Sequence, residues 1–232
     1  NIFPLRDFGV AIIIVTVLIK FLLVPLSKKQ IESQKKMQEL QPKIKTLQEK
    51  HKDNKEKQSR ELMAFYKENK TNPFSGCLPM IVQLVFLIAI YRVLFNISNA
   101  GLTVSAADLY SFVSNPGQIN KMFFGLVDLS STINLGKLAI KDIPQIILIV
   151  LAALSQYVQT KMLMASQPVK PAFKNEQPDF SQIMSKQMLY LGPLLTLFIG
   201  IKFPAGLALY WLVSTVFMIA QQHYLAKEKQ TR

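Results

Sequence analysis

The sequence has few of the residues on which enzyme chemistry and disulfide-bonded folds depend. Among its 232 residues there is one cysteine, Cys77, which cannot form an internal disulfide, and there are two widely separated histidines, His51 and His223. Isolated histidines without cysteine partners predict no zinc site. The chain also has no glycine-rich phosphate loop and no nucleophile elbow. We therefore expect no metal, no cofactor and no catalytic residue, and a protein that is not an enzyme.

Acidic residues are also scarce, and the long apolar runs have none. The chain has 14 Asp and Glu against 27 Lys and Arg, a formal net charge of +13. The charge-poor runs are residues 8–26, 78–91, 143–160 and 188–226. Their only charged residues are Lys20 and Lys202. About 20 mostly apolar residues cross a bilayer, so these runs exclude a soluble globular protein. The missing carboxylates also count against a proton-relay carrier.

The fold class that follows is all-α: a polytopic membrane protein with five transmembrane helices and a cytoplasmic helical hairpin between the first and second. The last run is too long for one crossing, and Pro204 and Gly206 predict a turn within it. The expected segments are residues 1–26 (first span), 27–76 (basic hairpin), 77–95 (second span), 96–142 (external segment with short interfacial helices), 143–163 (third span), 164–187 (cytoplasmic loop), 188–225 (fourth and fifth spans) and 226–232 (basic tail).

The basic residues predict the orientation of these spans. With five crossings, 20 of the 27 Lys and Arg fall on the side that holds the hairpin, the loop and the tail. An excess of positive charge marks the cytoplasmic side. We expect the N-terminus outside and the C-terminus inside a bacterial cytoplasmic membrane. A chain that begins at Asn1 leaves room for a preceding signal peptide or domain.

The basic hairpin has a narrow apolar seam, in which Met37, Leu40, Ile44 and Leu47 recur at heptad-like spacings. A turn is expected near residues 52–55. One interpretation is a solvated helix pair whose lysines only fix topology. The other is a docking surface for anionic lipid headgroups or ribosomal RNA. Its candidate residues are Lys28, Lys29, Lys35, Lys36, Lys43 and Lys45.

The external segment also allows two interpretations. Its apolar residues suit an amphipathic piece on the outer leaflet, or a small extracellular cap.

Lys20 is the strongest single indication of function, because a charge inside a span is costly and usually faces water or the bundle interior. Its long stem also allows the plain alternative of snorkelling to the headgroups. Thr16 lies four residues earlier, on the same helical face. Other polar or amphipathic candidates for a common cavity lie in the remaining spans: Gln83, Gln156, Gln159, Trp211 and Ser214.

Three strings resemble the YidC/Oxa/Alb family of membrane protein insertases. The first core helix of the family resembles the start of this chain, with FGVAIIIVT at residues 8–16, then Lys20, then PLSKKQ at residues 25–30. NPFSGCLPMIVQ at residues 72–83 resembles the start of the second. FPAGLALYW at residues 203–211, followed by Gln221 and Gln222, is the third match. Together with the basic segment after the first span, the resemblance covers nearly the whole chain.

The resemblance implies a five-helix core around a hydrophilic groove that is open to the cytoplasm and to lipid. It further implies an insertase and chaperone for nascent membrane proteins that uses no nucleotide. The ribosome, the signal recognition particle receptor and the Sec translocon are the partners to test, and no specific DNA is expected. The family commonly has arginine where this chain has Lys20, which keeps the charge but loses the planar fork of donors.

Two rival classes remain at this stage. A solute channel or transporter would also place polar groups inside a bundle, although no inverted repeat is evident. A membrane-tethered coiled-coil scaffold would explain the basic hairpin but not Lys20 and its polar companions.

Overall fold

Helices make up most of the chain, as the sequence predicts. The computed structural model describes residues 7–72, 78–99, 118–164 and 180–230, together with residues 109, 111, 112 and 115. The elements are α1 (Phe8–Leu22), α2 (Val24–Lys50), α3 (Lys55–Glu68), α4 (Leu78–Asn99), β1 (Met122–Phe123), β2 (Val127–Asp128), the 3-10 turn η3 (Ile140–Asp142), α5 (Ile143–Met164), α6 (Phe180–Lys202) and α7 (Ala205–Gln230).

Parts of several expected segments lie outside the described residues. They are residues 1–6, residues 73–77 at the end of the expected hairpin segment and the start of the second span, most of residues 100–117, residues 165–179 of the expected loop, and the last two residues of the tail.

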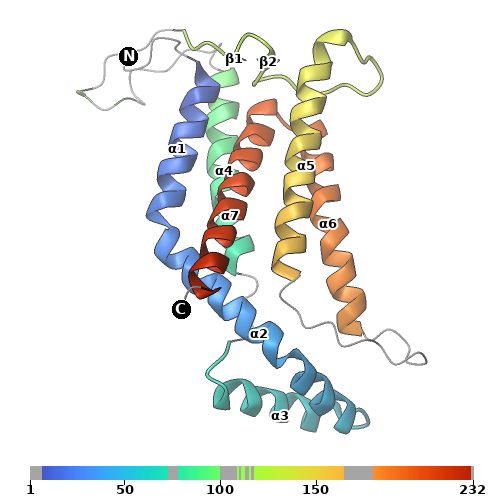
Figure 1. Ribbon diagram of the computed structural model, residues 1–232. Coiled ribbons are helices and arrows are strands. Elements are labelled where there is room, and N and C mark those ends of the chain that lie inside the picture. Colours follow the sequence, from blue (N-terminus) through green and yellow to red (C-terminus); the bar gives the residue numbers. More distant parts are fainter. Residues whose placement is uncertain are drawn as a thin grey trace.

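The long helices α1, α4, α5, α6 and α7 run side by side, and α7 packs against each of the others (Figure 1). Helices α2 and α3 project from one end of this bundle, here called the α2 end, and β1 and β2 lie at the other, here called the β end. α5 packs closely against α6 and α7, and α1 packs against α7, whereas α4 has few close neighbours. One half of the bundle is therefore tight and the other half is open.

The tight half depends on small residues near the β end. Ala205 and Ala208 of α7 are fully or almost fully buried in one cluster with Leu148 and Ile149 of α5. At Gly200 of α6, an added Cβ would lie 2.7 Å from the side chain of Ile149, so glycine allows α6 to approach α5 this closely. Small residues play this part in membrane helix packing generally.

The first expected span is interrupted by a bend. α1 ends at Leu22 and α2 begins at Val24, with an angle of 63° between the two helices. Pro25 has no N–H, so it cannot donate the hydrogen bond to the Phe21 carbonyl that a continuous helix requires. The first span that the sequence predicts, residues 1–26, therefore contains all of α1 and the start of α2, which meet at Leu23.

α2 and α3 form the helical hairpin, joined at residues 51–54, where the sequence predicts the turn. Asn54 begins α3 as its N-cap, and its side chain accepts a hydrogen bond of 2.9 Å from the backbone N–H of Lys57. Ile44 of the predicted apolar seam is buried. Pro42 lies inside α2 without ending it.

The external segment differs from the expectation of short interfacial helices. Among its described residues it holds an antiparallel β-hairpin, in which Met122 pairs with Asp128 and Phe123 with Val127, and the turn η3. Asp7 links this hairpin to α1: one of its carboxylate oxygens accepts a hydrogen bond of 2.8 Å from the backbone N–H of Phe124. The other carboxylate oxygen caps α1, because it accepts a hydrogen bond of 2.7 Å from the backbone N–H of Gly9. That long-range link is invisible to a local pattern.

The last expected hairpin also has different bounds. α6 begins at Phe180, eight residues before the expected start at residue 188, and α7 continues past residue 225 to Gln230. The extra turns are polar, so hydropathy assigned them to the loop and the tail. They contain no Pro or Gly that would end a helix.

Two helices are long and apolar enough to cross a bilayer alone, Ile140–Met164 and Ala205–Lys227. The bent pair of α1 and the start of α2 makes a third if it is one span. Ile81–Asn96 and Leu189–Lys202 are shorter apolar stretches. The structure thus shows a helical membrane protein with two or three candidate spans among the described residues.

Replacing Asp7 tests the link between α1 and the β-hairpin. Asp7→Ala removes the helix cap and the acceptor for Phe124, so we expect a loss of about 1–2 kcal/mol of stability. Asp7→Asn keeps one oxygen for the cap but turns an amide donor toward Phe124 N–H. Thermal unfolding in detergent should therefore rank the wild type above Asp7→Asn and Asp7→Ala lowest. Equal melting temperatures for all three proteins would contradict the assignment.

Acid should loosen the β-hairpin through Asp128. Burial alone raises the pKa of Asp128, but hydrogen bonds from Lys121 and Ser130 outweigh it and hold the pKa below the ordinary 3.8. A carboxyl whose folded pKa is depressed stabilises the fold fully above its unfolded pKa and loses that contribution as pH falls through the folded value. We expect the melting temperature of the wild type to fall more steeply below pH 3.8 than that of Asp128→Asn. Parallel curves would exclude this role.

Candidate functional site

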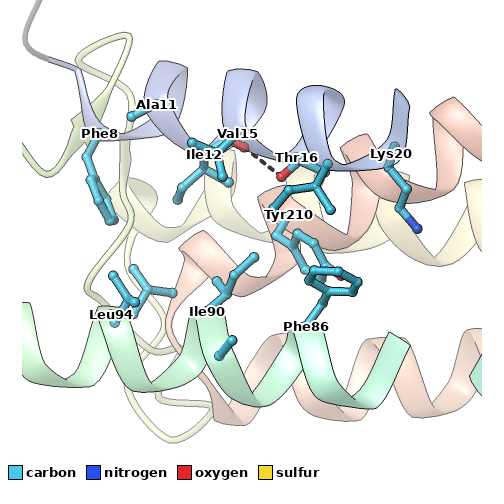
Figure 2. A pocket seen from close by; sticks show the side chains of 13 residues that line it. Phe8, Ala11, Ile12, Val15, Thr16, Lys20, Phe86, Ile90, Leu94 and Tyr210 are labelled. Carbon is cyan, nitrogen blue, oxygen red and sulfur yellow. Dashed lines mark hydrogen bonds between the residues drawn. The ribbon is translucent and has the colours of Figure 1, made fainter. Parts of the chain in front are cut away.

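A cavity of about 320 Å³ lies between α1 and α4. Figure 2 shows the side chains of α1 on one side, those of α4 on the other, and Tyr210 of α7 between them. Ile12 and Val15 belong to the α1 wall, and Phe86 and Ile90 to the α4 wall. The cavity exists because α4 approaches α7 at few points and does not pack closely on α1.

Lys20 lies at the end of this cavity nearest α2 (Figure 2). Phe8, Ile12, Thr16 and Lys20 recur every four residues, so one face of α1 lines the cavity along its whole length. Lys20 is half-buried, and within the described part of the chain it makes no ion pair or hydrogen bond. It is the one charged residue of the cavity wall.

Thr16 shares this wall but offers little polarity to it. Its side chain is only 2% exposed, and the hydroxyl donates a hydrogen bond of 2.6 Å to the carbonyl of Ile12, one turn earlier in α1. The donor of Thr16 is therefore already used inside the helix.

Gln83 and Ser214 form a second polar pair beside Tyr210. The hydroxyl of Ser214 donates to Gln83 Oε1 at 3.4 Å. Gln83 Nε2 and the hydroxyl of Tyr210 are buried and have no hydrogen-bond partner in the described structure. An unpaired buried polar atom costs about 1–3 kcal/mol, so both atoms favour a water molecule at this place.

Gln156 lies in a third group, on the side of α7 that faces α5. Its Oε1 accepts hydrogen bonds from Trp211 Nε1 at 3.2 Å and from the Thr215 hydroxyl at 3.4 Å. It also lies beside α6, because a Cβ on Gly192 would be 3.6 Å from its side chain. Gln156 therefore joins the three helices of the tight half and does not line the cavity.

The seven candidate groove residues thus do not converge at one place. Thr16 and Lys20 line the cavity, Gln83 and Ser214 meet behind it, and Gln156 and Trp211 bond to each other on the other side of α7. Gln159 lies one turn beyond Gln156, half-buried, without a hydrogen bond in the described structure.

Tyr210 is a residue of the cavity wall that is not among the sequence-predicted candidates. Its spacing of one turn before Ser214 was the available signal of an inward position.

A further polar group is built into the bend between α1 and α2. Gln221 of α7 donates to the Ser27 hydroxyl at 2.7 Å, which ties α7 to the first turn of α2. Gln30 and Gln222 are also buried, and each lies within three residues of Ser27 or Gln221 in the sequence. Both polar side-chain atoms of Gln222 lack a hydrogen-bond partner among the described residues. The six candidate docking lysines all lie on α2, where Lys29, Lys36 and Lys43 are exposed and the other three are half-buried.

The fold and the cavity define a helical membrane protein in which the described residues of a cavity between α1 and α4 include a single cation, Lys20. A family model described as "60Kd inner membrane protein" matches residues 2–232. The chain belongs to this family, that of the YidC/Oxa/Alb insertases.

Curated relatives of the chain carry the name membrane protein insertase YidC. The one from Rickettsia conorii is 32% identical over 230 residues, which cover 95% of this chain and 36% of the relative. The one from Streptomyces avermitilis is 31% identical over 232 residues, which cover 97% of this chain and 52% of the relative. The chain therefore spans about a third to a half of the length of these relatives.

The single tryptophan of the chain provides a direct test of the Gln156 group. Gln156→Leu leaves Trp211 Nε1 and the Thr215 hydroxyl without their acceptor, at a cost of about 1–3 kcal/mol. We expect a lower melting temperature and a shifted Trp211 emission. Gln159→Leu is the matched control, since Gln159 has no hydrogen bond to lose within the described structure. Identical spectra for the two variants would show that the hydrogen bond to Trp211 does not form.

Proposed function

We propose that the chain is the core of a membrane protein insertase. It receives a nascent segment at the cavity between α1 and α4 and releases it sideways into lipid, without nucleotide hydrolysis. The observation that carries this proposal is the cation of Lys20 on an apolar, lipid-side wall, with no anionic partner among the described residues. The names of the relatives support the same role.

The proposed topology has five spans: the bent pair of α1 and α2, then α4, α5, α6 and α7. α4 and α6 have 22 and 23 residues. At 1.5 Å per residue they are about 33–35 Å long, enough for a hydrocarbon core of about 30 Å, although only part of each is strongly apolar. Because α2 and α3 are rich in lysine, we place the α2 end in the cytoplasm and the N-terminus outside.

The mechanism follows from the two parts of the cavity. An acidic tail of the substrate is attracted to Lys20, while the unpaired atoms of Gln83 and Tyr210 hold water behind the cavity. A polar peptide then crosses less hydrocarbon, where each unsatisfied backbone group costs several kcal/mol. The apolar helix of the substrate lies along the walls of α1 and α4, and its transfer into lipid drives the step.

The hairpin of α2 and α3 is the proposed docking surface. Its exposed lysines suit ribosomal RNA, the signal recognition particle receptor or the Sec translocon, all of which would deliver or accept the substrate. Deletion of α3 should weaken delivery and leave insertion of a small substrate added directly to liposomes intact.

Charge reversal at Lys20 tests the electrostatic step. In proteoliposomes that contain only this chain, we expect Lys20→Glu to lower insertion of a small phage-coat-type substrate with an acidic tail several-fold, because attraction becomes repulsion. Lys20→Arg should retain insertion. Protease protection of the substrate gives the readout.

The matched control is Lys202→Glu, which makes the same charge change at an exposed position at the end of α6. Normal insertion by Lys20→Glu would remove the electrostatic step from the mechanism. Flux of ions or small solutes through the same liposomes, with no protected substrate, would instead favour a channel.

A further inference from the structure

The cavity between α1 and α4 has the chemistry of an amphiphile site. Its wall is apolar along most of its length, and its one cation stands at one end. Thr16 offers no free donor to the space, since its hydroxyl bonds to Ile12. An apolar wall of this kind does not hold ordered water, which needs two or more polar partners. An alkyl chain with an anionic head group complements both parts.

The cavity wall is long enough to hold one acyl chain. Its α1 wall runs from Phe8 to Lys20, twelve residues along a single helix face. At 1.5 Å per residue that is about 18 Å, close to the roughly 15 Å of half a hydrocarbon core. A phosphate at Lys20 therefore leaves its acyl chain alongside the whole apolar wall.

The position of Lys20 places it within reach of a phosphate. It lies three residues before Leu23, where the chain bends into the basic helix α2. Lys28 and Lys29 follow within the first turns of that helix. The headgroup region of the α2-side leaflet is therefore expected near Lys28 and Lys29, and the stem of Lys20 extends toward it.

The cavity is continuous with the bilayer. α1 and α4 do not pack closely on each other, and Val15 and Val93 on its two walls are each 51% exposed. A lipid can move into the space sideways from the surrounding leaflet without opening the bundle.

We propose that a phospholipid occupies this cavity when no substrate does, with its phosphate at Lys20 and an acyl chain between α1 and α4. The bound lipid supplies the anion that the described part of the protein does not. A substrate then displaces the lipid, so that the two compete for Lys20. This competition rests on the proposed function, whereas lipid binding does not.

Cross-linking tests the site. The full chain is reconstituted in vesicles that contain phosphatidylglycerol with a photoreactive group in one acyl chain, and the labelled residues are mapped. We expect labels to concentrate on the cavity walls of α1 and α4. Ala89→Trp and Ala11→Trp fill the cavity from its opposite walls and should each lower this labelling several-fold. Ala220→Trp, at an exposed position on α7, is the matched control.

A second arm tests the head group. Lys20→Glu should lower the phosphatidylglycerol retained per protein after detergent extraction, and Lys202→Glu should not. Inorganic phosphate should not compete, because it makes no contact with the apolar wall. Labels spread evenly over all lipid-facing helices, with the same result for Ala89→Trp and Ala220→Trp, would overturn the proposal.

Insertion of the substrate is measured in the same vesicles, so that the lipid site and the proposed insertase function are tested separately. If labelling of the cavity persists while no substrate is inserted, the lipid site stands and the proposed function fails. If the substrate is inserted but never lowers lipid labelling, the competition is wrong.

Discussion

The start of α7 is the constraint on which the rest of the structure depends. The first N–H groups of a helix have no partner inside it, and in a bilayer each one left unpaired costs several kcal/mol. Here the external segment supplies the acceptors: the carbonyl of Ser131 accepts from Ala205 N–H at 3.0 Å, and that of Leu129 accepts from Gly206 N–H at 2.9 Å. Ser131 also bonds to Gln145 of α5 at 2.8 Å. These bonds hold α5, α7 and the external segment together at the β end.

The tight β end determines where the cavity lies. α7 uses its small residues to pack on α5 and its polar residues to bond to Gln156, so little of its surface remains for α4. α4 is left with apolar side chains exposed along much of its length, among them Ile81, Val85 and Val93. The hydrogen bonds of Asp7 fix α1 at the β end, and Gln221 fixes the bend at the other. The space between α1 and α4 is what remains.

The sequence predicts the parts of this structure that depend on local chemistry. Hydropathy locates α4, α5 and α7 to within about five residues, Pro204 locates the turn before α7, and the heptad-like seam locates α2. It does not predict which residues meet. Asp7 and Phe124 are 117 positions apart, and nothing in either local pattern indicates their bond. Likewise, the glutamines of the spans look equivalent in the sequence. Only the rotation of each helix about its axis separates Gln156, which bonds to Trp211, from Gln83, which lies behind the cavity.

A lysine fits a cavity with this wall better than an arginine would. Arginine needs several acceptors arranged around its planar fork, whereas an ammonium is a compact charge that one phosphate or carboxylate can satisfy. The described wall of the cavity offers no such set of acceptors, since the hydroxyl of Thr16 already bonds to Ile12 and the remaining wall residues, apart from Tyr210, are apolar. A cation in such a place is costly until an anion arrives. A lipid phosphate and an acidic substrate tail meet the same need, so whichever is bound lowers the cost, and exchange between them requires no other source of energy.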